Sequence, residues 1–364
     1  MKAGIVGLPN VGKSTLFNCL SNAKAQSANF PFCTIEPNIG VVNVPDPRLE
    51  KLEELVNPER VQPATVDIVD IAGLVKGASK GEGLGNQFLG NIRECNAIIH
   101  VLRCFDNDNI VHVDGNVNPI RDKETIDIEL QLKDLDTVEK RLEKVKRAAK
   151  TGNKEAQVEE ALLERIKGTL LQAKSARTVE VLNNDEEVLM ESFQLITSKP
   201  VLYVCNVDEE SAATGNKYVD QIKELVKDED AEVIILAVGT EADITELETY
   251  EERKMFLEDL GLQEPGASVL IRSAYKLLNQ QTYFTAGVKE VRAWTINVGS
   301  TAPQAAGVIH TDFEKGFIRA EVIAYNDFVS FGSEAKVKEA GKLRVEGKEY
   351  IVKDGDVMHF RFNV

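Results

Sequence analysis

The chain has 364 residues, of which 43 are Lys or Arg and 59 are Asp or Glu, giving a net charge of −16. This length predicts two or three domains. The acidity argues against a protein that coats nucleic acid with its whole surface. No apolar signal core begins the chain and no run of about 18 apolar residues occurs, so we expect neither secretion nor a membrane span. Five scattered cysteines without a CxxC pair favour reduced thiols and the cytoplasm.

Short β-branched runs alternate with helical patterns over much of the chain. The runs lie at 3–6, 66–71, 98–102, 201–205 and 232–238. Continuous apolar runs are typical of parallel strands covered on both faces. We therefore predict a doubly wound α/β domain that comprises residues 1–127 and 199–280.

A phosphate-binding motif follows the first of these runs. Residues 7–14 match the pattern G-x4-G-K-[ST], and a helical pattern continues from Thr15. Glycines let backbone N–H groups face phosphates at a helix N-terminus. Lys13 would contact the β- and γ-phosphates, and Ser14 would bind Mg²⁺. The nucleotide-binding residues expected in this loop are Asn10, Val11, Gly12, Lys13, Ser14 and Thr15.

Two further elements have the character of nucleotide switches. Residues 70–73 form a D-x-x-G pattern, in which Asp70 would reach Mg²⁺ through water and the Gly73 N–H would sense the γ-phosphate. Thr34 lies between the two motifs, where GTPases place a Mg²⁺-binding switch threonine. The predicted metal ligands are thus Ser14, Thr34 and Asp70, and Lys13 and Gly73 would act in hydrolysis.

The base-recognition motif departs from that of GTPases. Guanine-binding proteins carry N-K-x-D after a late strand, whereas residues 206–209 here read N-V-D-E. Glu209 replaces the Asp that would accept both guanine N–H groups, and its greater length spoils a bidentate fit. Asn206 could still serve an exocyclic amine of adenine. We expect Asn206, Val207 and Glu209 to bind the base, with ATP preferred.

The segment 128–198 predicts an antiparallel helical hairpin inserted into the α/β domain. Apolar residues recur three and four apart on either side of a polar turn at 151–153. They are Leu135, Val138, Leu142 and Val145, followed by Val158, Leu162, Ile166 and Leu170. Seven cations and one acid lie within 140–154, which favours contact with phosphates. The cations are Lys140, Arg141, Lys144, Lys146, Arg147, Lys150 and Lys154.

The C-terminal part of the chain has a different pattern and charge. Segments 294–299, 317–322 and 350–352 read as short strands, and 354–356 reads as a turn. Residues 285–364 include 11 basic and 11 acidic side chains, so the net charge lies upstream. The two changes coincide, which predicts a separate domain at 281–364.

Taken together, the motifs resemble those of the YchF / Obg-like ATPase family. The stretches that carry the resemblance are 7–15, 29–38, 70–90, 206–209, 283–294 and 353–356. The resemblance implies a P-loop NTPase G domain, an inserted helical arm, and a C-terminal α+β TGS domain of the ubiquitin-like β-grasp type. It also implies a preference for ATP and a link to ribosomes and stress responses.

The residue that orients the attacking water is not where Ras-like GTPases have it. Leu74 stands in place of their Gln, and Leu cannot orient water. The nearest candidate is His112, in an acidic, Asn-rich loop that we expect to be mobile, and the family resemblance supports a catalytic role for it. Asn10 matches an Asn that helps to hold K⁺ in related GTPases, which makes K⁺ a second candidate ion.

These observations predict a monomeric, Mg²⁺-dependent ATPase switch whose nucleotide state controls binding to a ribosome, ribosomal RNA or another partner. Two alternatives stay open at this point. One is a GTPase of the Obg class in which Glu209 still accommodates guanine. The other is a nucleotide-sensing binding module in which hydrolysis is incidental.

Overall fold

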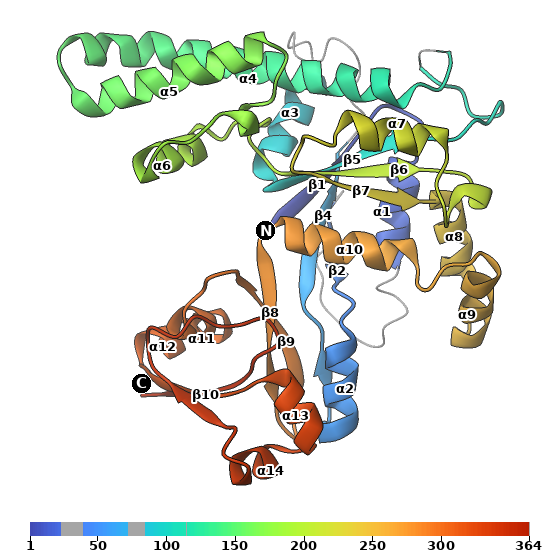
Figure 1. The fold of residues 1–364 in the computed structure, drawn as a ribbon, viewed down its shortest axis with the longest axis vertical. Coiled ribbons are helices and arrows are strands. Elements are labelled where there is room, and N and C mark those ends of the chain that lie inside the picture. The colour runs from blue at the N-terminus through green and yellow to red at the C-terminus, as the bar shows by residue number, and fades with distance from the viewer. Residues whose placement is uncertain (23–38, 72–83, 114, 364) are drawn as a thin grey trace. The chain divides into compact units, whose positions relative to one another are not determined.

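The computed structural model describes residues 1–22, 39–71, 84–113 and 115–363. Contacts divide the chain into two compact units, residues 1–40 with 67–270 and residues 41–66 with 271–364 (Figure 1). The three-part domain division stays a prediction. Within the described ranges, no helix is both long enough and apolar enough to cross a membrane.

The first unit is built on a sheet with the strand order β2-β4-β1-β5-β6-β7. Its strands are β1 (Lys2–Val6), β2 (Ile39–Asn43), β4 (Thr65–Asp70), β5 (Ala97–Arg103), β6 (Val201–Asn206) and β7 (Glu232–Leu236). β1 pairs in parallel with β4 and β5, and β6 pairs in parallel with β5 and β7. β5 and β6 are buried along their whole lengths, as their continuous apolar runs require. The predicted α/β fold is confirmed.

The strand register brings the carboxyl ends of these strands to one edge of the sheet. Ile5 lies opposite Asp70, and Arg103 lies opposite Asn206. The loops that follow the strands therefore share this edge, where open α/β sheets bind their ligands. Asp70 at the end of β4 and the predicted site residues that follow β1, β5 and β6 lie at or next to this edge.

Helices of the first unit lie on the sheet or extend from it. They include α1 (Lys13–Asn22), α3 (Leu84–Glu94), α7 (Lys217–Leu225), α8 (Val238–Glu246), α9 (Tyr250–Asp259) and α10 (Gly266–Leu277), the last shared with the second unit. β7 ends before Val238, which begins α8 rather than ending the predicted strand.

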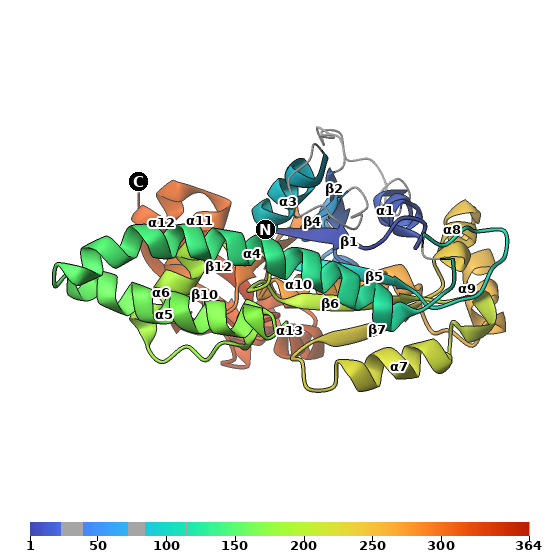
Figure 2. The ribbon, with the colours of Figure 1, turned by 90° about the horizontal axis from the view of Figure 1, so that it is seen from above.

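The predicted helical hairpin consists of α4 (Pro119–Lys150) and α5 (Lys154–Leu171), which lie side by side with α6 (Asn184–Phe193) near them (Figures 1 and 2). Its buried core includes Val138, Leu142, Leu162, Ile166 and Leu170. The prediction was wrong for Val158, which is 39% exposed.

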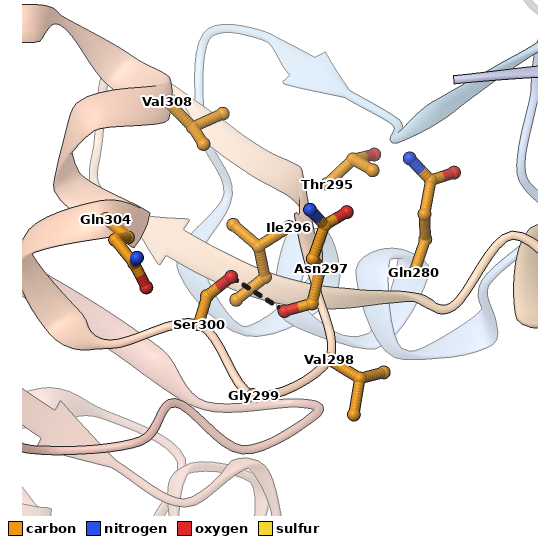
Figure 3. Close-up of a pocket in the computed structure, with 9 residues that line it drawn as sticks. All are labelled: Gln280, Thr295, Ile296, Asn297, Val298, Gly299, Ser300, Gln304 and Val308. Atoms are coloured by element: carbon orange, nitrogen blue, oxygen red, sulfur yellow. Dashed lines mark hydrogen bonds between the residues drawn. The ribbon is translucent and has the colours of Figure 1, made fainter. Parts of the chain in front are cut away.

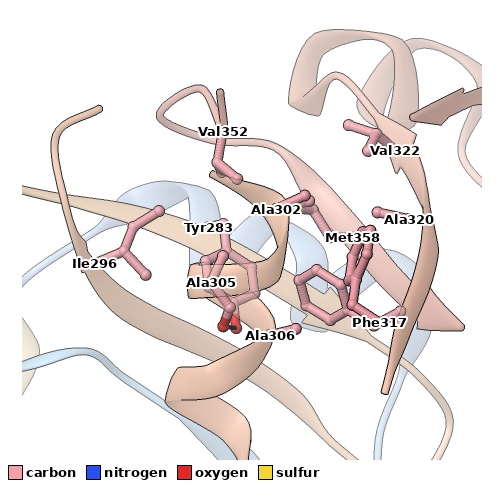
Figure 4. Packing of buried hydrophobic residues seen from close by; sticks show 11 residues of the cluster. Tyr283, Ile296, Ala302, Ala305, Ala306, Phe317, Ala320, Val322, Val352 and Met358 are labelled. Atoms are coloured by element: carbon pink, nitrogen blue, oxygen red, sulfur yellow. Dashed lines mark hydrogen bonds between the residues drawn. The ribbon is translucent and has the colours of Figure 1, made fainter. Parts of the chain in front are cut away.

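The second unit has a sheet of order β11-β10-β12-β8-β9-β3. Its strands are β3 (Val61–Gln62), β8 (Gln280–Ala286), β9 (Val291–Asn297), β10 (Phe317–Ile323), β11 (Arg344–Glu346) and β12 (Val357–Phe362). Its helices are α2 (Pro47–Val56), α11 (Ala302–Ile309), α12 (Thr311–Lys315), α13 (Tyr325–Phe331) and α14 (Glu334–Glu339). The side chains of Tyr283, Ala305, Phe317 and Met358 pack in its core (Figure 4).

Two of the three predicted C-terminal strands are confirmed as β9 and β10. The third, at 350–352, was wrong, because that segment makes only an isolated bridge between Thr301 and Ile351. β12 was missed although its residues alternate between buried and exposed from Met358 onward.

Candidate nucleotide-binding site

The phosphate loop connects β1 to α1 and folds back over itself. The Lys13 Nζ donates a hydrogen bond of 2.7 Å to the Leu8 carbonyl, which draws the side chain over the loop. Gly12 has φ +100°, and a Cβ added to it would lie 2.5 Å from Asn206 Nδ2. Glycine is therefore required at this position for both conformation and space.

The Lys13 ammonium is buried, with 7% of the residue exposed. Burial lowers the pKa of Lys13 from 10.5 to about 8, and the nearby Asp70 carboxylate partly opposes this. A phosphate bound at this loop would compensate the positive charge of the buried ammonium, which water does not solvate. The loop is thus built for an anion.

Ser14 and Asp70 meet at the start of α1, where the predicted metal ligands belong. The Ser14 Oγ donates to Asp70 Oδ2 at 3.3 Å. Asp70 Oδ1 is buried and has no hydrogen-bond partner among the described residues. A hydroxyl oxygen beside a carboxylate with an unsatisfied oxygen is a donor set that suits Mg²⁺. Thr34 and Gly73, the other predicted residues, lie outside the described residues.

The base loop is tied to the phosphate loop through one side-chain amide. Asn206 is 4% exposed; its Nδ2 donates to the Val11 carbonyl at 2.9 Å, and its Oδ1 accepts from the Val238 N–H at 3.0 Å. Asn206 therefore joins β6, the phosphate loop and the start of α8. One amide hydrogen and one oxygen lone pair stay available to a base.

The other two predicted base residues differ in burial. Val207 is 3% exposed, and its N–H donates to the Leu236 carbonyl at 3.0 Å. Glu209 is exposed at the start of the short helix η3 (Glu209–Ser211), whose first turn is capped by Asp208. In the phosphate loop, Thr15 is exposed on the first turn of α1. The structure brings Asn206 to the phosphate loop, binds Val207 to β7, and leaves Glu209 at the surface.

His112 lies in a loop next to the phosphate loop, and its side chain is buried; the expected mobility of this loop stays a prediction. Its side chain is 3% exposed, and its Nε2 lies 2.9 Å from Asp122 Oδ2. The residue before it, Val111, accepts a hydrogen bond of 3.2 Å from Asn10 Nδ2. The His112 loop and the phosphate loop are therefore in direct contact.

Arg103, at the end of β5, fixes the start of the same loop. Its guanidinium is buried and donates to the carbonyls of Phe105, Asn107 and Ile110 at 3.2, 3.0 and 2.9 Å. Five-donor geometry makes Arg suited to binding several carbonyls at once. We expected mobility from the acidic, Asn-rich composition of the loop, which gives no sign that Arg103 binds its backbone.

Sequence reasoning missed Arg103, Asp122 and Val238 as parts of this region. Asp122 had a detectable signal, because Asn118 and Pro119 are a helix N-cap followed by Pro, which places Asp122 in the first turn of α4. Arg103 lies opposite Asn206 in the sheet, and the Val238 N–H binds the Asn206 side chain. Neither contact between distant residues can be inferred from the sequence.

A separate hollow of about 520 Å³ lies in the second unit (Figure 3). Its lining side chains carry no charge: Gln280, Thr295, Ile296, Asn297, Val298, Gly299, Ser300, Gln304 and Val308. A site for a nucleoside triphosphate needs cations or helix N-termini directed at the phosphates. The phosphate loop, rather than this hollow, is the candidate nucleotide site.

Loop, sheet edge and helix N-terminus together define a P-loop NTPase of the GTPase-like class. A family model described as "50S ribosome-binding GTPase" matches residues 2–134. The model of the YchF GTPase C-terminal domain, described as a protein of unknown function (DUF933), matches residues 280–363.

Full-length relatives identify the family within this class. The chain is 59% identical to "Ribosome-binding ATPase YchF" of Haemophilus ducreyi, covering 100% of this chain and 99% of that protein. It is 56% identical to the protein of that name in Bacillus subtilis, with 100% of both chains covered. The structure of the Schizosaccharomyces pombe YchF GTPase matches with a TM-score of 0.89 and 40% identity, over 99% of this chain and 97% of that one. The chain belongs to the YchF family.

Proposed function

We propose that this protein is a Mg²⁺-dependent ATPase switch whose nucleotide state controls its binding to the ribosome. The observation that carries the proposal is the buried Lys13 and the Ser14–Asp70 pair at a helix N-terminus, followed in space by a base loop that lacks N-K-x-D. The names of the full-length relatives, which describe ribosome-binding ATPases, support both halves of it.

Preference for ATP follows from the base loop. Asn206 keeps one donor and one acceptor for a base, whereas the exposed Glu209 is not fixed in position for the two N–H groups of guanine. A polar site that leaves the wrong base unpaired discriminates strongly. A GTPase in which Glu209 still accommodates guanine is the second candidate.

Hydrolysis would use residues of the sheet edge. Mg²⁺ held by Ser14, Thr34 and Asp70 would neutralise charge on the β- and γ-phosphates. Lys13 would contact the same oxygens, and the Gly73 N–H would face the γ-phosphate. His112 would orient the attacking water, since Leu74 cannot.

A monovalent cation is a further component of the proposal. Asn10 uses its Nδ2 for Val111, and its Oδ1 makes no hydrogen bond to the described residues. An amide oxygen at this loop position is a suitable ligand for K⁺, which would supply charge where other GTPases use an arginine finger. Hydrolysis should then be faster in K⁺ than in Na⁺ at equal ionic strength.

The ribosome contact is assigned to the end of the helical hairpin. Three of the seven predicted cations are neutralised: Lys140 pairs with Asp136, Arg141 with Glu159 and Lys146 with Glu164. Lys144, Arg147 and Lys150 are exposed and have no ion pair within the described ranges. We call these three residues the tip patch; their spacing of three places them on neighbouring positions of α4.

Competition between ATP and GTP is the experiment that tests the proposal. Wild-type protein should bind ATP at least about tenfold more tightly than GTP in the presence of Mg²⁺. Equal affinity for the two nucleotides would favour the GTPase alternative. Turnover that is unaffected by ribosomes, together with nucleotide-dependent ribosome binding, would favour a binding module with incidental hydrolysis.

A further inference from the structure

The loop that carries His112 has an inverted burial pattern. Ile110, Val111 and Val113 are 38%, 75% and 52% exposed, whereas the His112 side chain between them is 3% exposed. Apolar side chains normally favour the buried positions of a segment. Apolar burial therefore does not explain why His112 points inward.

A hydrogen bond to Asp122 explains it. The His112 Nε2 lies 2.9 Å from Asp122 Oδ2, and Asp122 is 1% exposed. Asp122 Oδ1 accepts from Arg121 Nη2 at 3.2 Å, and Arg121 in turn donates to the Asn116 carbonyl at 2.7 Å. The carboxylate also lies in the first turn of α4, where the helix dipole favours a negative charge. Asp122 is thus held by Arg121 and by the helix terminus, while the apolar side chains that flank His112 are exposed.

We propose that Asp122 is a positioning residue that restrains His112 in this buried state, and that ATP hydrolysis requires His112 to leave it. The inference rests on the proposed function, in which His112 orients the attacking water. His112 cannot give the same nitrogen both to Asp122 and to a water at the γ-phosphate. Contact with Asn10 keeps the loop beside the phosphates, so release needs only a local change.

The restraint gives the hairpin a direct route to the site. Asp122 belongs to α4, a helix of 32 residues that extends to Lys150 at the tip patch. Such a helix spans about 48 Å at 1.5 Å per residue. A partner that binds the tip patch and shifts α4 by a small amount would act on the His112–Asp122 hydrogen bond.

Single-turnover hydrolysis of ATP tests the proposal through a double-mutant cycle. Asp122→Ala should hydrolyse ATP about tenfold faster than wild type without ribosomes, with ATP affinity changed less than about twofold. The same change in a His112→Ala background should have no effect on the rate. Asp108→Ala removes an exposed carboxylate from the same loop and should leave the rate unchanged.

The outcomes separate this inference from the function on which it rests. Slow hydrolysis by His112→Ala, with Asp122→Ala equal to or slower than wild type, would overturn the restraint and leave the role of His112 intact. Wild-type hydrolysis by His112→Ala would overturn that role and the restraint with it. Asp122→Leu, which has a similar volume and no hydrogen-bonding group, provides the same comparison if Asp122→Ala does not fold.

Chemical modification of histidine gives a readout independent of hydrolysis. With diethyl pyrocarbonate, His112 should be protected in wild type and modified in Asp122→Ala. His310, whose side chain is 59% exposed, should react in both proteins, and His100, which is 2% exposed, should react in neither. Equal protection of His112 in both proteins would contradict the proposal.

Discussion

The phosphate loop and the His112 loop touch at the bond from Asn10 to Val111, yet they are held in different ways. The phosphate loop is fixed by backbone conformation and by the buried amide of Asn206. The His112 loop exposes its apolar side chains and is held by polar contacts, among them those of Arg103, of Asp122, and of Asp106, whose carboxylate accepts from the Tyr218 hydroxyl. Under the proposed function, nucleotide binding would depend on the phosphate loop, and hydrolysis would depend on a loop that polar contacts hold in place.

This difference separates affinity from rate. Under the proposed function, a phosphate loop that keeps one conformation would keep a similar affinity for phosphate before and after a partner binds. Under the proposal, a partner that breaks the hydrogen bond between His112 and Asp122 would change the rate of hydrolysis without changing affinity. Four substitutions or conditions test this division, beginning with the largest expected effect.

Gly12→Ala should abolish nucleotide binding, weakening ATP affinity by at least about 1,000-fold. The new Cβ would lie 2.5 Å from Asn206 Nδ2 at φ +100°, so both the loop and the base-site amide must move. Isothermal titration with ATP measures the effect. Gly168→Ala is the control, because Gly168 lies in α5 with nothing within 4 Å of an added Cβ; it should bind ATP normally and gain stability.

The buried His100 of β5 predicts a loss of stability at low pH. His100 is buried, its Nε2 has no partner within the described part of the chain, and burial together with Lys123 and Arg177 lowers its pKa from 6.5 to about 3. The unfolded chain therefore binds a proton that the folded chain does not between these values, and the free energy of unfolding falls as pH drops from 6.5 to 3. The loss should reach about 4 kcal/mol.

Urea unfolding of wild type and His100→Leu across this pH range measures that contribution. The difference in unfolding free energy between the two proteins should change by about 1.4 kcal/mol for each pH unit below 6.5, over the range in which both still fold. His359→Gln, at an exposed position, is the matched control. If the free energy of unfolding depends on pH in the same way in wild type and in His100→Leu, folding does not lower the pKa of His100.

The phosphate loop could be predicted from sequence because its requirements are local. Consecutive residues supply the glycine conformation, the cation and the hydroxyl, and a strand and a helix flank them. The parallel strands were equally readable, since each is a continuous apolar run. The sheet edge as a ligand site follows from that fold alone.

The His112 loop could not be predicted in the same way. We expected it to be mobile from its composition, which does not reveal that Arg103 binds its backbone or that Asp122 binds His112. Burial of a polar residue between exposed valines is a tertiary effect that opposes the usual pattern. The strand predicted at 350–352 was wrong, again for a tertiary reason, because Ile351 makes only an isolated bridge to Thr301 and the chain then enters the turn at 354–355.

Arg103→Met tests the first anchor of the His112 loop. Loss of the three hydrogen bonds should lower the free energy of unfolding by about 2–3 kcal/mol. The loss is not larger because water can bind some of the freed carbonyl groups. Amide hydrogen exchange should increase over residues 105–113, while ATP affinity stays within about threefold of wild type. Arg319→Met, at an exposed position of β10, should change stability by less than about 0.5 kcal/mol. A large loss of ATP affinity in Arg103→Met would mean that the two loops are one rigid unit.

The tip patch tests whether a partner acts on rate through α4. Changing Lys144, Arg147 and Lys150 to Gln should weaken ribosome binding about tenfold at moderate salt and lower the log–log salt slope by about 2.7, if each cation contacts one phosphate. ATP affinity and hydrolysis without ribosomes should not change, because no nucleotide contact is altered, but stimulation by ribosomes should fall with the loss of binding. The matched control is Lys140→Gln with Lys146→Gln, whose ammonium groups already pair with Asp136 and Glu164. Equal effects of the two sets on ribosome co-sedimentation would show that general charge, rather than the tip patch, governs the contact.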